Sequence, residues 1–261
     1  MPDYPAVTRS TVALILHGFT GMLSTVRILG DVCDERDLPS TMPVLRGHGT
    51  LPEDLEGVTW REWYEDAEAA LFEITSKGEK AIVMGLSMGG LVTLDLASRH
   101  PDRICGVVTV NACMRLAPRL LALLPLIARV KPYWEGQKKT MEARGIHAYP
   151  RFPTRTLASL VEYTRVIPTR LSHVTQPMLV VQSWGDLVVR PSAARAIYDG
   201  ISSRDKELAR FEDRQHDMLL GPGREDVAHR IGEWLDARRP LWSPCPGAGG
   251  KSQETGREAG R

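Results

Sequence analysis

The stretch AIVMGLSMGGLVTLDLASRH, residues 81–100, joins two hydrophobic patterns at one tight turn. Its first five residues form an aliphatic run that is typical of a buried strand, and from Met88 onward leucine and valine recur at helical spacing until Pro101 stops the pattern. Between the two patterns, Gly85-Leu86-Ser87-Met88-Gly89 matches G-x-S-x-G. This motif needs a strand, a sharp turn and a helix in that order, so Ser87 is predicted to be a nucleophile held on a strained turn.

Two glycines flank the serine for a steric reason. The positions two before and two after it approach neighbouring backbone and leave no space for a side chain, a condition that Gly85 and Gly89 meet. The turn also holds the Ser87 hydroxyl beside the start of a helix, whose free N–H groups favour developing negative charge. A hydroxyl is a weak nucleophile at neutral pH, so Ser87 requires a base within hydrogen-bond distance, and this base is usually histidine.

Similar short apolar runs recur along the chain and predict further buried strands. They cover residues 11–16, 41–45, 80–85, 106–110 and 177–182, with a weaker run at 207–211. Amphipathic helical segments lie between the runs, and one of them begins after Thr59, which forms a capping-box pattern with Glu62. Strands that alternate with helices predict an α/β fold with a mostly parallel central sheet flanked by helices.

The alternation stops in residues 113–176, where a helical apolar pattern, prolines and basic residues appear without a convincing strand. We predict that residues 113–176 form a helical cap insertion, while residues 1–112 and 177–241 form the core. An insertion at this place lies above the carboxyl ends of the strands, where open α/β sheets bind their ligands. Residues 242–261 are rich in glycine, proline, serine and charge, which predicts a disordered tail.

Charge and composition argue against several classes of partner. Because 33 Lys and Arg nearly balance 32 Asp and Glu, neither nucleic acid nor an anionic membrane is an expected partner. The most apolar stretch, residues 116–130, is interrupted by prolines and falls short of the roughly 20 residues that span a bilayer. It can still rest on a lipid surface, line an acyl pocket or form the core of the cap. The chain start lacks the pattern of a secretory signal and the cysteines show no paired spacing, so a cytoplasmic protein with free thiols is expected.

The base is sought among the five histidines after the serine, because hydrolases with this turn carry serine, acid and histidine in that order, each after a strand. His147 and His173 precede the strand that should carry the acid, so they are in the wrong order. His100 and His229 belong to helical segments and are interpreted as structural. His216 follows the run at 207–211 by a short polar loop, as expected of a base after the last strand. We therefore predict that His216 is the general base.

The acid is expected after the strand at 177–182, where Ser183-Trp184-Gly185-Asp186 forms a turn. From this place Asp186 can accept a hydrogen bond from the His216 ring, fix its tautomer and stabilise the imidazolium. Asp213 and Asp217 lie close to His216 in sequence, but chain geometry makes them poor partners for its buried nitrogen. Asp186 is therefore predicted to be the orienting carboxylate.

Attack by serine on a carbonyl also needs two backbone N–H donors for the oxyanion. One is expected from Met88, next after the nucleophile, and the other from Phe19, whose loop follows the strand at 11–16. His17 is interpreted as a residue that organises this loop rather than as a second base. The sequence contains no HExxH, no paired CxxC, no GxGxxG after its first strand and no GxxxxGK, so no metal and no cofactor is predicted.

Five motifs together resemble the bacterial carboxylesterase and monoacylglycerol lipase family of α/β-hydrolases, over roughly residues 10–238. They are HGFTG (17–21), LRGHG (45–49), GLSMGG (85–90), GDLVV (185–189) and QHD (215–217). The resemblance implies an α/β-hydrolase fold, the triad Ser87, Asp186 and His216, and oxyanion donors at Phe19 and Met88. It also implies hydrolysis of carboxylic esters, commonly short to medium acyl esters or monoacylglycerols, through an acyl-serine intermediate.

Other functions use the same residues. The triad does not dictate the leaving group, so an amidase, a thioesterase, a carbon–carbon bond hydrolase or an acyltransferase remains open. A non-catalytic ligand receptor on the same fold is a second class, which a complete triad disfavours. A structural protein with chance motifs requires several independent coincidences in the correct order. An ester hydrolase acting on a small-molecule ester or lipid is therefore the favoured hypothesis.

Overall fold

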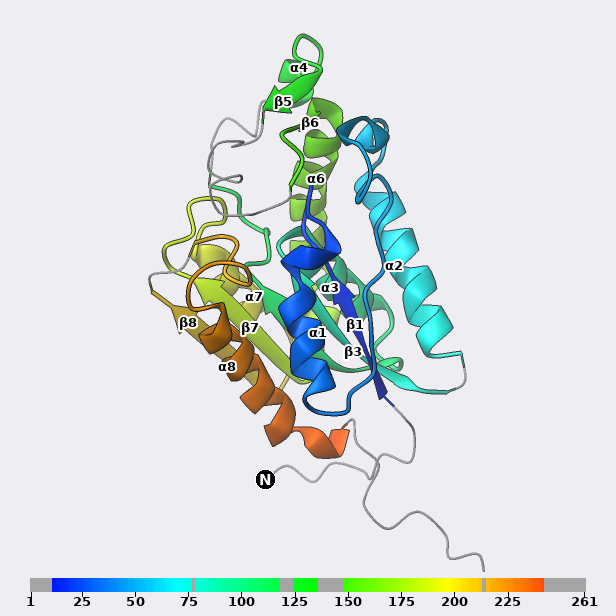
Figure 1. Ribbon diagram of the computed structural model, residues 1–261, viewed down its shortest axis with the longest axis vertical. Coiled ribbons are helices and arrows are strands. Elements are labelled where there is room, and N and C mark those ends of the chain that lie inside the picture. Colours follow the sequence, from blue (N-terminus) through cyan, green and yellow to red (C-terminus); the bar gives the residue numbers. More distant parts are fainter. Residues whose placement is uncertain (1–10, 77, 118–123, 136–147, 213–214, 242–261) are drawn as a thin grey trace, which may run out of the picture.

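The computed structural model describes residues 11–76, 78–117, 124–135, 148–212 and 215–241. A six-stranded sheet forms its centre in the order β2-β1-β3-β4-β7-β8, and all neighbouring strands are parallel (Figure 1). The strands are β1 (Thr11–Leu16), β2 (Ser40–Thr41), β3 (Lys80–Leu86), β4 (Ile104–Val110), β7 (Met178–Ser183) and β8 (Lys206–Phe211). The predicted α/β fold with a mostly parallel sheet is confirmed.

The strand order changes direction between β1 and β3. From β1 the chain moves to one edge of the sheet to form β2, then crosses back so that β3 pairs with the other side of β1. Open α/β sheets bind ligands outside the carboxyl ends of their strands at such a switch point. Ser87 directly follows β3 and the loop with Phe19 follows β1, so both lie at this point.

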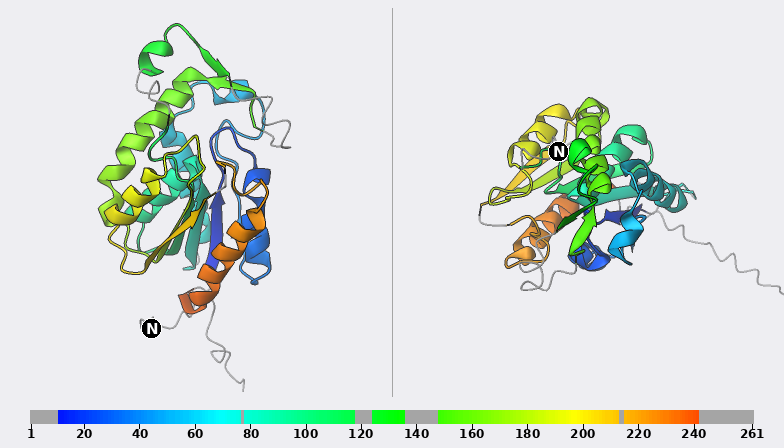
Figure 2. Two further views of the ribbon diagram at one scale, coloured as in Figure 1. Left: turned by 90° about the vertical axis from the view of Figure 1, so that its left-hand side faces the viewer. Right: turned by 90° about the horizontal axis from the view of Figure 1, so that it is seen from above.

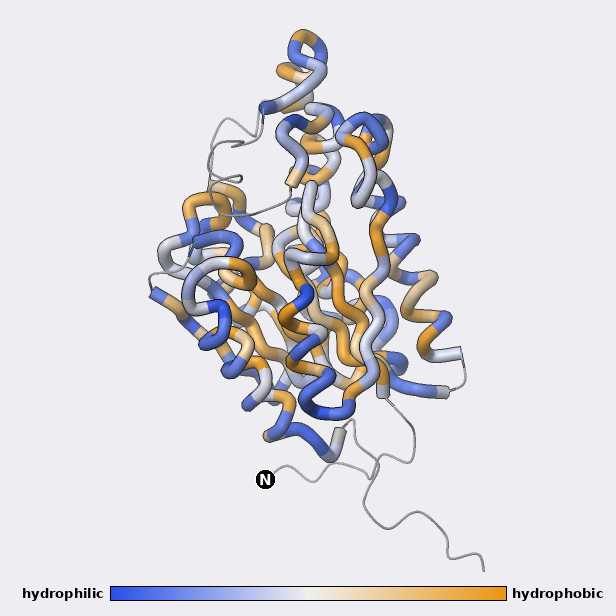
Figure 3. The backbone as a smooth tube through the Cα atoms, viewed as in Figure 1, coloured by the Kyte–Doolittle hydropathy of each residue, from blue (hydrophilic) through white to orange (hydrophobic). Residues whose placement is uncertain are grey.

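Helices cover both faces of the sheet, which explains why its strands are apolar throughout (Figures 2 and 3). Alternate strand residues divide between two cores: Leu14 and Val83 face one layer, and Ala13 and Ile82 face the other. The first layer holds α2 (Trp60–Ile74), α3 (Met88–Arg99) and α7 (Ser192–Gly200), and the second holds α1 (Arg27–Asp34) and α8 (Arg224–Ala237).

The start of helix α2 is set by the capping box that the sequence predicts. The Thr59 N–H donates to the Glu62 carboxylate at 2.8 Å, so the predicted capping box at the start of α2 is confirmed. This bond occupies a backbone donor that the helix itself leaves without a carbonyl partner. The start of α2, below the cap, is thereby fixed by local chemistry.

β2 is shorter than the sequence predicts. The run at 41–45 was expected to be a strand, but only Ser40 and Thr41 pair with β1. Pro43 has no N–H and cannot extend the hydrogen-bond ladder. Leu45 is nevertheless fully buried, and its N–H donates to Nε2 of His17 at 3.1 Å. The apolar run thus contributes to the core as an extended loop.

The segment predicted as a helical cap also contains strands, which the sequence analysis missed. It includes α4 (Leu124–Ile127), β5 (Tyr133–Glu135), β6 (Arg151–Pro153) and α6 (Thr154–Val166), and β5 pairs with β6 in antiparallel register. Three residues are too few to show an alternating pattern, so no sequence signal marked them. The division at residues 113 and 176 stays a prediction, and the predicted tail, 242–261, lies outside the described residues.

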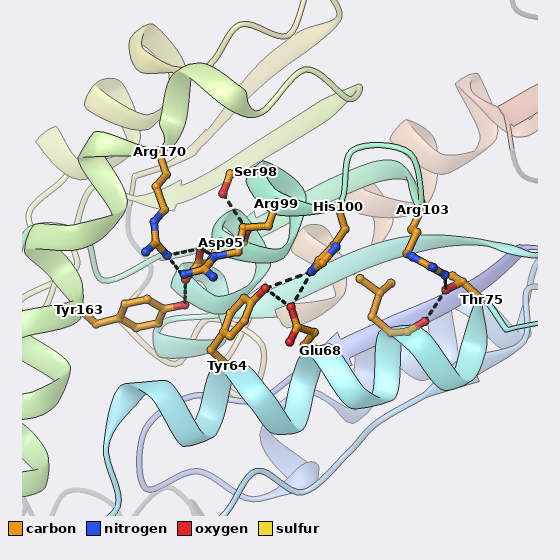
Figure 4. Close-up of polar contacts among 11 residues, drawn as sticks. Tyr64, Glu68, Thr75, Asp95, Ser98, Arg99, His100, Arg103, Tyr163 and Arg170 are labelled. Atoms are coloured by element: carbon orange, nitrogen blue, oxygen red, sulfur yellow. Dashed lines mark hydrogen bonds and ion pairs between the residues drawn. The ribbon is translucent and has the colours of Figure 1, made fainter.

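Helix α6 is fixed to α3, the helix that starts after Ser87, by a buried carboxylate (Figure 4). Asp95 of α3 is fully buried, accepts the Tyr163 hydroxyl at 2.9 Å and pairs with Arg99 Nε at 2.8 Å and with Arg170. The ring of Tyr163 in turn stacks on Trp60 at 4.6 Å between centroids. A buried carboxylate is stable only when it is paired and hydrogen-bonded, and such bonds are directional. The contacts of Asp95 therefore hold α6 in place over α2 and α3.

Candidate active site

Ser87 occupies a strained turn between β3 and α3. Its backbone has φ 54° and ψ −112°, a conformation that residues with a side chain rarely adopt and that persists only when the surroundings enforce it. The Ser87 N–H donates to Val110 O at 2.9 Å, and the Ser87 carbonyl accepts the Cys113 N–H at 3.2 Å. The end of β4 therefore holds the turn from the neighbouring strand.

The two glycines of the motif have the crowded surroundings that the sequence predicts. A Cβ atom on Gly85 would lie 2.3 Å from the Gly89 carbonyl oxygen, and one on Gly89 would lie 2.3 Å from the Leu16 carbonyl oxygen. Gly90 is equally restricted, since its Cβ would lie 2.7 Å from that of Ala112. These close approaches press the serine turn against the end of β1.

His216 lies in the turn between β8 and α8 and bridges two side chains from distant parts of the chain. Its Nε2 atom is 3.0 Å from Ser87 Oγ, and its Nδ1 atom is 2.8 Å from Asp186 Oδ2. A carboxylate only accepts hydrogen bonds, so we assign the proton to Nδ1, which leaves Nε2 free to accept the Ser87 hydroxyl hydrogen. Ser87, His216 and Asp186 are thus brought together in the predicted order.

Asp186 is buried and fully engaged. While Oδ2 contacts His216, Oδ1 accepts the N–H groups of Val188 at 2.7 Å and Val189 at 2.9 Å. These backbone bonds fix the carboxylate within its own loop. Of the alternative acids, Asp217 is present beside His216 but does not take the Nδ1 contact, and Asp213 lies outside the described residues.

The surroundings raise the pKa of His216 above its ordinary value of 6.5. Burial acts to lower this pKa, but the hydrogen bond and charge of Asp186, aided by the charge of Asp217, outweigh it. A raised pKa makes the neutral ring a stronger proton acceptor than free imidazole.

The loop after β1 passes directly beside the serine. A Cβ atom on Gly18 would lie 3.3 Å from the Ser87 Cβ, and Phe19 comes next in the chain. His17 is fully buried, with Nδ1 2.9 Å from the Gly18 carbonyl oxygen and Nε2 accepting the Leu45 N–H. Both ring nitrogens therefore hold the loop through backbone contacts, which agrees with the interpretation of His17 as a residue that organises this loop.

The second candidate oxyanion donor is Met88. It is the first residue of α3, where a helical N–H has no carbonyl partner within the helix. With Phe19 on the loop after β1, the two amides come from segments that flank Ser87 on different sides. Their role in binding an oxyanion stays a prediction.

An aromatic cluster on the Phe19 side escaped the sequence analysis. The Phe19 ring lies 5.1 Å from Phe152 of β6, 5.7 Å from Trp63 and 6.2 Å from His48, between centroids. Burial lowers the pKa of His48 to about 3, so its ring is neutral. Only its place in the LRGHG motif hinted at a role. The cluster joins the loop after β1 to β6, which lies in the segment predicted as the cap.

The remaining histidines and the cysteines have other surroundings. His100 ends α3, about 18 Å along the helix from its start, and contacts Glu68 at 2.7 Å (Figure 4). His173 and His229 are exposed, while His147 and Cys245 lie outside the described residues. Burial raises the pKa of the three other thiols, to about 12 for Cys33, about 11 for Cys105 and about 12 for Cys113.

Within the described ranges, no three His, Cys, Asp or Glu side chains are grouped as a metal site. No helix in that part of the chain combines the length and apolar character needed to cross a membrane.

The fold and these contacts define an α/β-hydrolase with a serine, histidine and aspartate in line. The family described as serine aminopeptidase, S33, matches residues 8–222, and the chain belongs to this family. The resemblance seen in the sequence motifs is confirmed, and the protein is a serine hydrolase.

Individual relatives agree with this assignment. The chain is 33% identical to the thermostable monoacylglycerol lipase of Bacillus sp. (strain H-257), over 79% of this chain and 83% of that protein. It is 27% identical to a carboxylesterase of Bacillus subtilis (strain 168), over 85% and 91% of the two chains. A solved structure from a study of two metagenome-derived lipolytic enzymes, LipS and LipT, is 30% identical. It superposes with a TM-score of 0.80, covering 89% of this chain and 96% of that one.

Replacing the turn glycine Gly89 with alanine should destabilise the protein by about 3 kcal/mol or more, because the new Cβ collides with rigid strand backbone. Urea unfolding followed by circular dichroism measures the loss. Gly221→Ala is the matched control, since its nearest non-neighbouring atom lies 3.8 Å away, and it should change the free energy of unfolding by less than about 0.5 kcal/mol. Equal stability of the two variants would contradict the crowding.

If His216 is the base that the sequence predicts, the rate of ester cleavage should fall as the pH drops through its pKa, because only a neutral ring can accept a proton. Asp186→Asn removes the groups that raise this pKa, so the decline should move to lower pH and the plateau rate should fall by about 10⁴-fold. Profiles of kcat/KM against pH test this. Asp217→Asn should shift the decline far less; an unshifted Asp186→Asn profile would refute the assignment.

Proposed function

We propose that the protein hydrolyses carboxylic esters through an acyl-serine intermediate, with Ser87 as nucleophile, His216 as general base and Asp186 as orienting carboxylate. The observation that supports this is the unbroken line of contacts from Ser87 Oγ through the His216 ring to Asp186, at 3.0 and 2.8 Å. Such a line lets proton removal accompany attack on the carbonyl carbon.

The reaction then runs in two halves. His216 Nε2 takes the Ser87 proton as Oγ bonds to the carbonyl carbon, and the amides of Phe19 and Met88 hold the resulting oxyanion. Collapse of this intermediate breaks the bond to the alkoxy oxygen, which leaves as the alcohol with the proton from His216. A water molecule then gives a proton to His216 Nε2 as its oxygen attacks the acyl carbon. Collapse of this second intermediate breaks the bond between the acyl carbon and Ser87 Oγ, and His216 returns the proton to Oγ, which releases the acid and restores Ser87.

The substrate is a small-molecule ester or lipid, and we propose monoacylglycerols or short to medium acyl esters. Relatives that are named monoacylglycerol lipase and carboxylesterase support this class. The cap begins beside the acid loop: Leu116 bridges Val189, and the Ala117 N–H donates to the Val188 carbonyl at 2.8 Å. The apolar stretch 116–130, for which the sequence leaves lipid contact, an acyl-binding wall and a plain cap core open, thus starts beside the loop of Asp186. We propose that it lines the acyl pocket; residues 118–123 lie outside the described residues.

The other acyl-transfer reactions are not favoured. An aminopeptidase, as the family description reads, needs an anionic group for the substrate ammonium. Both oxygens of Asp186 are already engaged, with His216, Val188 and Val189, so this carboxylate serves the histidine rather than a substrate ammonium. Cleavage of a neutral ester needs no such anionic group in addition to Ser87, His216 and Asp186.

We further propose that the protein meets its lipid substrate at an interface and acts in the cytoplasm. Three exposed apolar side chains support interfacial contact: Leu51 is 62% exposed, Val130 84% and Leu187 86%. Leu51 and Leu187 belong to loops that follow β2 and β7, and Val130 belongs to the cap, so all three lie at the end of the molecule that holds the site. Apolar side chains on one end give weak, reversible affinity for lipid.

Ser87→Ala should lower kcat by about 10⁶-fold, since the attacking atom is lost. Nitrophenyl esters of increasing acyl length, monoacylglycerols and amides form the substrate panel, and labelling by a fluorophosphonate reports the nucleophile directly. Ser98→Ala, on the same helix but bonded only within it at the Asp95 carbonyl, is the control and should keep both activity and labelling. Undiminished turnover by Ser87→Ala would remove the mechanism.

Replacing both Leu51 and Val130 with serine should slow hydrolysis of long-chain monoacylglycerol in vesicles while leaving hydrolysis of a dissolved short-chain ester unchanged. The reason is that the variant loses apolar contact with lipid but keeps the site. Phe72→Ser is the control. It removes an exposed apolar side chain near the C-terminal end of α2, away from the site, and should leave the rates of both assays unchanged. Equal effects of the two variants on the vesicle assay would argue against interfacial contact at the cap.

A further inference from the structure

Asn111 occupies a special place that no motif of the sequence marks. It directly follows β4, between β3, which leads to Ser87, and β7, which leads to Asp186. Its side chain is fully buried, and its φ of 45° lies in the left-handed region, where asparagine is among the few tolerated residues. A buried polar side chain on strained backbone needs a reason in its contacts.

The side-chain amide of Asn111 joins two loops that are distant in sequence. Its Oδ1 accepts the N–H of Ser183, the last residue of β7, at 2.8 Å. Its Nδ2 donates to the carbonyl oxygen of His216 at 2.8 Å, with the Gln215 carbonyl oxygen at 3.4 Å. One amide therefore ties the strand that carries the acid to the main chain of the base.

The neighbours of Asn111 hold the nucleophile. The Val110 carbonyl accepts the Ser87 N–H, and the Cys113 N–H donates to the Ser87 carbonyl. The Asn111 N–H itself donates to the Val181 carbonyl of β7 at 2.9 Å. Val110, Asn111 and Cys113 thus bind backbone at Ser87, at His216 and near the end of β7.

His216 needs such support because it lies in a turn, outside the regular hydrogen bonding of strand or helix. Its ring must span Ser87 and Asp186 at once, and a displacement of about 1 Å at a catalytic group can cost on the order of 10²-fold in rate. A bond from a buried amide to the His216 carbonyl limits that displacement. The bond also satisfies a carbonyl that would otherwise lose its partner.

We propose that Asn111 is a positioning residue that sets the height of the His216 main chain above β7, so that the imidazole reaches both Ser87 and Asp186. It touches neither substrate nor reacting atoms. The proposal rests on the proposed function of the three residues as a triad, and it adds a fourth side chain on which their alignment depends.

Asn111→Gly is the first test, because glycine accepts the positive φ while both side-chain bonds are lost. We expect kcat per folded active site to fall on the order of 10- to 100-fold with KM little changed, since substrate contacts remain. The acid limb of the pH profile should move to lower pH, because a displaced ring loses the Asp186 bond that raises the pKa of His216. If Asn111 only stabilised the fold, its loss would leave the acid limb of the pH profile in place and would not lower kcat per folded site.

Asn111→Asp separates the two bonds. Aspartate tolerates this backbone and keeps the acceptor for the Ser183 N–H, but its carboxylate cannot donate to His216 and adds negative charge nearby. We expect kcat to fall here too, because the bond to the His216 carbonyl is again lost. The added negative charge opposes the fall in the pKa of His216, so the acid limb should move less far to lower pH than in Asn111→Gly.

Tyr163→Phe is the matched control, because it removes an equally buried hydrogen bond, to Asp95, away from the site. It should lower Tm while leaving kcat and the pH profile unchanged. Fluorophosphonate titration counts folded active sites in every sample, so partial unfolding does not mimic the effect. Wild-type kcat and pH profile in the folded fraction of both Asn111 variants would overturn the proposal. A wild-type protein that the fluorophosphonate fails to label would instead refute the proposed function.

Discussion

The whole site depends on one crowded turn, in which the main chain at Ser87 is forced to a positive φ between β3 and α3. Gly85 and Gly89 make this possible, since any side chain at either position would overlap with backbone at 2.3 Å. The strain is held by parallel strands on both sides, and such cores do not deform gradually. The hydroxyl is therefore placed by the sheet, and the other groups must be brought to it.

The proposed base and acid lie in loops, which are more mobile than strands or helices, and buried hydrogen bonds fix their positions there. Asp186 is fixed by the N–H groups of Val188 and Val189, and the main chain of His216 is bonded by Asn111. The same contacts set the chemistry, because the carboxylate that orients the ring also raises the pKa of His216 against the effect of burial. Geometry and proton affinity thus have a common origin.

The sequence predicts those features that local chemistry determines. The sharp turn at Ser87, its glycines and the start of α2 follow from steric and hydrogen-bonding needs of adjacent residues. The order of motifs pointed to Asp186 and His216, which the structure brings into contact with each other and with Ser87, while their catalytic roles stay a prediction. The predicted strand at 41–45 was wrong in extent because Pro43 cannot pair, and β5 and β6 are too short to show a pattern. Asn111 and His48 went unnoticed because their roles arise from contacts with residues far along the chain.

The central claim is that Ser87 carries the acyl group during turnover. Mixing the protein with a nitrophenyl ester, quenching in acid within the first turnover and mapping the modified peptide by mass spectrometry tests it most directly. The account predicts one added acyl group on the peptide that contains Ser87. Rapid turnover with no acylated peptide, or with the acyl group on a different residue, would contradict it.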